Sequence, residues 1–68
     1  MKLSIIKKVS QNIRKYRKSN GLTQKQMENH GFDYRHYQKI ESGRINLHIS
    51  TIEELSKAFG VPAFKFFK

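Results

Sequence analysis

A polar stretch between residues 34 and 42 holds two cations, an amide and an aromatic ring at steps of three and four residues. Residues at this spacing share one face of a helix. Guanidinium, ammonium, amide and phenol groups can all donate hydrogen bonds to the edges of DNA bases or to phosphate oxygens. The stretch therefore predicts a helix face suited to contact with a nucleic acid. Its outward members are Tyr34, Arg35, Gln38, Lys39 and Ser42.

Histidine is the other residue type in this chain that commonly does chemistry, as a metal ligand or a proton carrier. His30, His36 and His48 lack the four-residue pairing and the neighbouring cysteines of a zinc site, so no metal is predicted. We expect His30 to be half-buried in a turn, His36 to donate to a phosphate and His48 to lie in a loop or cap a helix. No nucleophile stands beside a base and no glycine-rich phosphate loop is present, so neither an enzyme nor a cofactor is predicted.

The charge of the chain points to a polyanionic partner. Fourteen Lys and Arg oppose five Asp and Glu, which gives a formal net charge of +9. All five acids lie from Glu28 onward, whereas the preceding residues include eight basic ones and no acid. Such a basic domain displaces counterions from phosphates, which favours a nucleic acid over charge that serves solubility alone.

The length and composition predict one small domain over residues 1–68. The chain has no cysteine, so no disulfide or thiolate zinc site can stabilise it, and helical packing or a partner must do so. No apolar run approaches the roughly 20 residues of a membrane span. The N-terminus also lacks the apolar core of about 7–15 residues that a secretory signal needs. We therefore expect a cytoplasmic, nucleoid-associated protein without membrane contact.

Glycines divide the chain into segments in which apolar residues recur at steps of three and four. This is the pattern of amphipathic helices, and no segment alternates long enough to predict a strand. We therefore expect an all-α fold, a compact bundle of five short helices. They are predicted at residues 4–19, from 23 to about 30, 33–42, 50–59 and 62–67.

The predicted helix starts carry capping signals. Thr23 and Gln26 have the spacing of a capping box, in which each side chain bonds to the backbone N–H of the other residue. Asp33 is the predicted cap of the third helix. Ser50 with its own capping box is the predicted cap of the fourth, with His48 as the alternative.

The second and third helices, joined by a tight glycine turn, make a helix-turn-helix over about residues 23–42. Around this motif the chain contains, in order, Asn12-Ile13-Arg14 with Arg17, Gly21-Leu22-Thr23-Gln24, Ile40-Glu41-Ser42-Gly43-Arg44 with Asn46, Thr51-Ile52 with Leu55, and Ala58-Phe59-Gly60-Val61. In order and spacing these pieces resemble the Cro/phage-repressor type, or XRE, family of helix-turn-helix domains over roughly residues 9–67. The resemblance implies a lambda-repressor-like fold that binds DNA.

The resemblance also implies roles for individual side chains. Arg17 and Glu41 would form a structural ion pair that ties the first helix to the end of the third. The residues expected to read bases in the major groove are Tyr34, Arg35, Gln38 and Lys39, and those expected on phosphates are Thr23, Gln24, His36, Ser42, Arg44 and Asn46. Arg35 is the best candidate for base readout, because a guanidinium can bond to O6 and N7 of guanine together. For Tyr34 and Gln38, base contact and backbone contact remain equal alternatives.

The chain departs from the commonest family pattern near the turn. The interval from Gln24 to Ile40 is one residue shorter, and the shortening falls between Met27 and Phe32. His30 also replaces the leucine usual before the turn glycine. These departures leave the angle of the third helix open.

The residues and the resemblance together predict a sequence-specific regulator of transcription that binds double-stranded DNA. Repression as a homodimer on a near-palindromic operator is the form expected. More phenylalanines gather near the C-terminus than one short helix can bury, which offers a surface for self-association. The alternative function is a protein-interaction module, such as an antitoxin or a restriction-modification controller protein, with a protein as its partner. A membrane-active or RNA-binding cationic chain is disfavoured by the pattern of capped helices.

Overall fold

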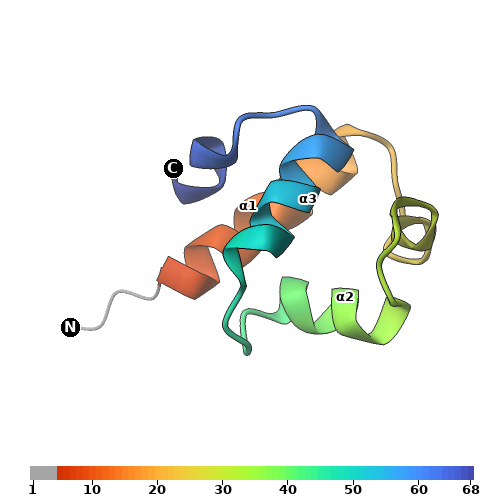
Figure 1. Cartoon of the computed structure of the whole chain (residues 1–68), viewed down its shortest axis with the longest axis horizontal. Helices are drawn as coiled ribbons and strands as arrows, with labels where there is room; N and C mark the ends of the chain where they lie inside the picture. The colour runs from red at the N-terminus through yellow and green to blue at the C-terminus, as the bar shows by residue number, and fades with distance from the viewer. Residues whose placement is uncertain (1–4) are drawn as a thin grey trace.

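The computed structural model describes residues 5–68, and five helices follow one another within that range (Figure 1). Three are α-helices, α1 (Ile5–Ser19), α2 (Tyr34–Ser42) and α3 (Ile49–Phe59), and two are 3₁₀-helices, η1 (Lys25–His30) and η2 (Ala63–Phe67). The predicted all-α bundle of five short helices is confirmed. Ser4, where the first helix was predicted to begin, lies outside the described residues.

α1 is the helix around which the others pack. It contacts α2, α3 and η2, while η1 packs against α2 and η2 also contacts α3. Figure 1 shows η1 and α2 gathered at one side of the fold, with η2 at the opposite end near the start of α1. The helix-turn-helix, η1 followed by α2, is therefore held on the rest of the domain mainly through α1.

One apolar core fills the space between the helices. Its members are spaced by three and four along each α-helix, so each α-helix buries one face, as the sequence predicts, and η1 and η2 add one buried residue each. Each fully buried side chain of this size contributes about 1.5–3 kcal/mol to folding. The core consists of Val9, Ile13, Met27, Phe32, Tyr37, Ile40, Ile52, Leu55, Phe59 and Phe66.

The second helix is a 3₁₀-helix, and this explains how the chain accommodates its short interval between Gln24 and Ile40. A 3₁₀-helix rises about 2.0 Å per residue against about 1.5 Å in an α-helix. η1 therefore spans a given length with fewer residues than an α-helix would need. It ends at His30, as the sequence predicts.

The turn signals around η1 and α2 act largely as predicted. Thr23 and Gln26 form the capping box, with the Gln26 N–H 3.1 Å from Thr23 Oγ1 and the Thr23 N–H 2.8 Å from Gln26 Oε1. Asp33 caps α2 by accepting a hydrogen bond of 3.0 Å from the N–H of His36.

The half-buried position predicted for His30 is wrong. Its side chain is exposed, because Met27 and Phe32 fill the core on either side of the turn.

Two predicted helix starts are corrected. α3 begins at Ile49, and the N-cap position belongs to His48, whose carbonyl accepts from the N–H groups of Thr51 and Ile52 at 3.0 and 3.2 Å. Ser50 therefore lies within the first turn and does not cap the helix. Pro62 is the extended residue just before η2 and does not lie in its first turn.

Gly43 allows the loop after α2 to lie directly on α1. Its φ is +74°, and a Cβ at this position would lie 2.9 Å from Ser10 Oγ and 3.5 Å from the Cα of Lys7. Ser10 is itself buried and donates to the carbonyl of Lys7 at 2.9 Å. Both the backbone conformation and the close approach therefore favour glycine here.

Gly43→Ala is expected to lower the free energy of unfolding by at least about 1–2 kcal/mol, the cost of a left-handed conformation for an L side chain. Gly21→Ala is the matched control, because Gly21 has a φ of +70° but a Cβ added there would meet no atom within 4 Å. Denaturant unfolding of both variants separates backbone strain from the contact with Ser10. If Gly43→Ala and Gly21→Ala lowered the free energy of unfolding equally, the contact between the added Cβ and Ser10 would have no cost.

Candidate nucleic-acid interface

The outward face of α2 is polar and basic. Tyr37 and Ile40 of this helix are fully buried, which turns the residues between them toward solvent. A surface hollow of about 550 Å³ lies along this face and reaches into the following loop. The structure thus brings together three of the predicted base readers and two of the predicted phosphate ligands. The hollow is lined by Arg35, Gln38, Lys39, Ser42, Arg44 and Ile45.

The fourth predicted reader, Tyr34, is fixed at the start of α2 by two contacts. Its hydroxyl accepts a hydrogen bond of 3.2 Å from Nε2 of Gln38. The ammonium of Lys25 lies 5.0 Å from the centroid of its ring, a cation–π distance. Lys25 is not among the residues predicted for DNA contact, because its place beside Tyr34 comes from the packing of η1 against α2. Tyr34 and Gln38 are therefore joined to each other on the α2 face.

The loop after α2 holds Arg44 close to the helix. Ser42 donates to the carbonyl of Lys39 at 2.6 Å and accepts from the N–H of Arg44 at 3.3 Å. Asn46, predicted alongside them, lies elsewhere, since it lines an apolar hollow between the ends of α1 and α3. His36 is exposed on α2, one residue after Arg35.

A second basic hollow, of about 440 Å³, lies where α1 meets the start of η1 and α2. Thr23 and Gln24, both predicted on phosphates, line it, but each also has a partner within the fold. Thr23 holds the capping box, and Gln24 donates to Glu41 Oε1 at 2.9 Å. The complete lining is Arg14, Arg17, Leu22, Thr23, Gln24, Lys25 and Tyr34.

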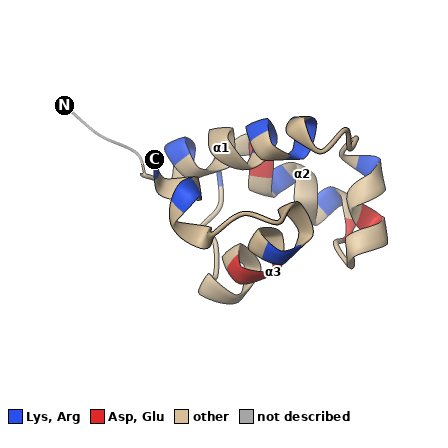
Figure 2. Ribbon diagram, turned by 90° about the horizontal axis from the view of Figure 1, so that it is seen from above, with Lys and Arg blue, Asp and Glu red and all other residues tan. Residues whose placement is uncertain are grey.

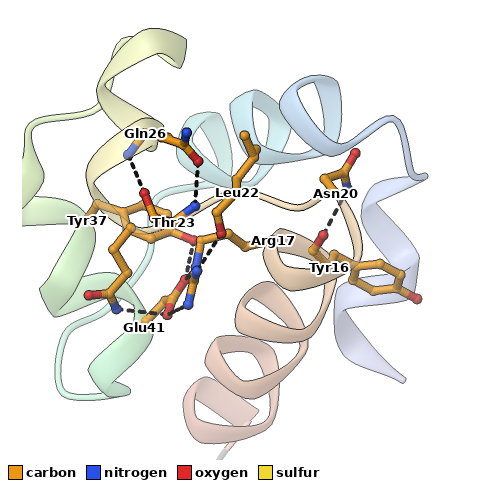
Figure 3. A network of polar contacts seen from close by, with 9 residues as sticks. Tyr16, Arg17, Asn20, Leu22, Thr23, Gln26, Tyr37 and Glu41 are labelled. Atoms are coloured by element: carbon orange, nitrogen blue, oxygen red, sulfur yellow. Dashed lines mark hydrogen bonds and ion pairs between the residues drawn. The ribbon is translucent and has the colours of Figure 1, made fainter.

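Beneath these surfaces, a buried polar network joins α1, the segment before η1, and α2 (Figure 3). Arg17 makes two contacts with Glu41, from Nε at 2.6 Å and from Nη2 at 3.2 Å, and its Nη1 donates to the carbonyl of Leu22 at 2.7 Å. The side chains of Arg17 and Glu41 are only 8 % and 3 % exposed. The ion pair that the resemblance implies is therefore present, and it is buried.

Tyr37 completes the network from within the core. Its hydroxyl donates to Oε2 of Glu41, and its ring packs edge-on against Phe32 with centroids 5.8 Å apart. Helix spacing alone puts Tyr37 on the buried face of α2 and assigns no partner to its hydroxyl. A signal was available, because a buried tyrosine generally needs a partner for its hydroxyl.

The network stabilises the charged forms of its ion pair. Burial by itself would raise the pKa of Glu41, but hydrogen bonds from Arg17, Tyr37 and Gln24 outweigh it and hold the pKa below the ordinary value. The hydrogen bond to Glu41 raises the pKa of Arg17. Burial and the same carboxylate raise the pKa of Tyr37, so its hydroxyl stays protonated and remains a donor.

Two other kinds of site receive no support within residues 5–68. No group of three or more histidine, aspartate or glutamate side chains there could hold a metal ion. None of the helices in this range has the length and hydropathy to cross a bilayer.

Comparison with known proteins identifies the motif. A helix-turn-helix family model matches residues 13–66, which run from the middle of α1 to η2 and include η1, the turn and α2. No curated protein and no solved structure gives a match. The family match covers most of the chain, and the structure places an exposed polar helix second in the motif. The chain therefore belongs to the Cro/repressor-type (XRE) family of helix-turn-helix DNA-binding regulators.

Proposed function

We propose that this protein is a sequence-specific transcriptional repressor that binds double-stranded DNA as a homodimer, with α2 in the major groove. The observation that carries the proposal is the exposed face of α2, where Arg35, Gln38 and Lys39 surround one hollow. The major groove is about 12 Å wide and admits an α-helix. The donors on this face match the acceptors that guanine and adenine present in that groove.

Phosphate contacts would come from either side of α2. Ser42 is the last residue of α2 and Arg44 lies in the loop after it, whereas Thr23, Gln24 and Lys25 precede its start. Such contacts set the position of a protein on the duplex, whereas the base contacts set sequence preference. A promoter covered in this way would be closed to other proteins, which is the basis for proposing repression.

Selection of bound duplexes from a random DNA library tests the proposal. An enriched inverted repeat, bound at least about 10³-fold more tightly than scrambled DNA, would support a dimeric reader of sequence. No enrichment, with all affinity lost at higher salt, would contradict it. Tight binding of a protein that survives both high salt and loss of Arg35 would instead favour the interaction-module alternative.

The homodimer is proposed through an apolar patch at the end of the fold formed by α1, α3 and η2. Ile5, Ile49 and Phe67 are 60 %, 78 % and 49 % exposed and line one hollow of about 300 Å³. Phe66 of the same C-terminal segment is fully buried, so only part of the phenylalanine cluster is available for association. The loop that follows α2 ends at this patch, where α3 begins. With a net charge of +9 on each copy, DNA would stabilise the pair by neutralising their repulsion.

Ile49→Asp is expected to reduce the species bound to the selected operator from two copies to one and to weaken binding at least about tenfold, because a buried charge opposes the interface. The fold should persist, since Ile49 is largely exposed. Phe64→Asp is the control, because Phe64 is also exposed but does not line the patch. Sedimentation with the operator duplex gives the number of copies. If two copies of the Ile49→Asp variant bound the operator cooperatively, the proposed interface would be refuted.

A further inference from the structure

α1 carries more positive charge than its own stability favours. It holds six cations and no acid, and all of them except Arg17 are exposed. Like charges four residues apart repel, as Arg14 and Lys18 do, and cations in the first turn oppose the helix dipole. Figure 2 shows the positions of Lys and Arg, in blue, spaced along the α1 ribbon, whereas the acidic positions of α3, in red, lie away from α1. The cations of α1 are Lys7, Lys8, Arg14, Lys15, Arg17 and Lys18.

The exposed cations form two rows that face different neighbours. The first row consists of Lys7, Arg14 and Lys18, which are seven and four residues apart and so share one face. Arg14 lines the basic hollow at the start of η1 and α2, and the backbone of Lys7 lies against Gly43 at the end of α2. From Lys7 to Arg14 the first row therefore runs along the flank of α2, and Lys18 lies one turn further along α1.

The second row consists of Lys8 and Lys15 and faces η2. Lys8 lines a hollow together with Ile5, Phe67 and Lys68 at the C-terminal end of the chain. The ammonium of Lys15 lies 5.7 Å from the centroid of the Tyr16 ring, and that ring meets Phe66 of η2 edge-on. The packing of the helices thus separates two sets of cations that the sequence places side by side.

We propose that the first row binds the DNA backbone strand that passes the start of η1, as a phosphate-binding surface additional to the helix-turn-helix. The proposal rests on the proposed function. Neither Arg14 nor Lys18 pairs with a carboxylate among the described residues, so no carboxylate of this range competes with a phosphate for them. The row is about 16 Å long at about 1.5 Å per residue. One DNA strand carries a phosphate every ~3.4 Å of helix axis, so several phosphates lie within this length.

The test compares two double variants that each remove two charges from α1. Arg14→Gln with Lys18→Gln changes the first row, and Lys8→Gln with Lys15→Gln changes the second. Binding of the full chain to the selected operator and to a mixed-sequence duplex is titrated at several salt concentrations. The first variant is expected to reduce the slope of log affinity against log salt by about two on both duplexes, and to weaken binding at least about tenfold at about 50 mM salt. The second variant should leave the slope within about half a unit of the unmodified chain.

Each outcome decides the proposal separately from the proposed function. Equal changes of the salt slope in both double variants would show that the charge of α1 acts only at long range. An unchanged salt slope in the first double variant would show that the first row stays in solvent and binds no phosphate. Either result overturns the inference while leaving the helix-turn-helix function intact. A chain that selects no duplex at all would refute the proposed function itself. Thermal unfolding of both variants checks that the fold is retained.

Discussion

Glu41→Ala is expected to lower the free energy of unfolding by about 3–5 kcal/mol, because it leaves the buried guanidinium of Arg17 without its counter-charge. The same change removes the acceptor for Tyr37 and Gln24. A domain of this size has a total stability of only several kcal/mol, so a large part of the population would be unfolded at room temperature. Circular dichroism against denaturant measures the loss.

Milder variants keep this prediction testable if Glu41→Ala does not fold. Tyr37→Phe removes one hydrogen bond from the network and is expected to cost about 1–3 kcal/mol. Replacing both charges, with Arg17→Met and Glu41→Leu, should restore much of the stability, because a well-packed apolar pair avoids the cost of a buried lone charge. Glu53→Ala is the control on an exposed carboxylate. A loss from Glu41→Ala no larger than this control would contradict the structural role of the network.

The same ion pair links stability to acid. The pKa of Glu41 is lower in the folded protein than its ordinary value near 4.5, so the folded state binds its proton less readily than the unfolded state does. The resulting stabilisation is complete above that ordinary value and is lost as the pH falls through the lowered pKa of the folded state. Unfolding measured between neutral pH and strong acid should show this decline, and Glu41→Gln should reduce it.

Arg35→Ala is expected to weaken binding to the selected operator by about 1–3 kcal/mol, roughly tenfold to a hundredfold, and to remove the preference at one base pair. Arg35 lies on the exposed face of α2, where a guanidinium can meet a guanine edge. Binding to scrambled DNA should fall far less. Repeating the library selection with the variant identifies the base pair whose preference has been lost.

Arg44→Ala is the matched control for this assignment, because it removes the same charge from the loop after α2. A phosphate contact carries no sequence information, so its loss should weaken binding to all duplexes alike and reduce the salt slope by about one. The base preferences should remain as in the unmodified chain. The division between base reading and backbone binding would be refuted if both variants lowered operator and scrambled affinity by the same factor.

The helices and the core could be predicted from the sequence because their signals are local. Apolar residues at steps of three and four identified the buried faces, including Val9, Ile13 and Leu55. Asp33 caps α2 as its spacing indicated. Thr23 makes the predicted reciprocal bonds with Gln26, but η1 begins at Lys25 and its N-cap position belongs to Gln24. The cap of α3 was mispredicted because Ser50 and His48 are both compatible with local spacing, and the first backbone hydrogen bonds of α3 formed on His48.

The candidate interface was only partly predictable. The face of α2 follows from helix periodicity once Tyr37 and Ile40 are taken as the buried residues. The contact between the Lys25 ammonium and the Tyr34 ring depends on how η1 packs against α2, and that packing is set by contacts distant in sequence. For the same reason, Asn46 could not be separated from the other loop residues before the fold was known.

The basic charge follows from composition alone. The five helices, their apolar faces and the polar face of α2 could also be predicted, since each depends on neighbours within one or two helical turns. The tertiary structure alone decided which buried groups meet Glu41, which side of α1 each cation faces, and which phenylalanines remain exposed. Arg17 and Glu41 are 24 residues apart, and only the packing of α2 against α1 brings them within 2.6 Å. Local spacing sets the faces of helices, but the contacts between those faces depend on how the whole chain fills one small core.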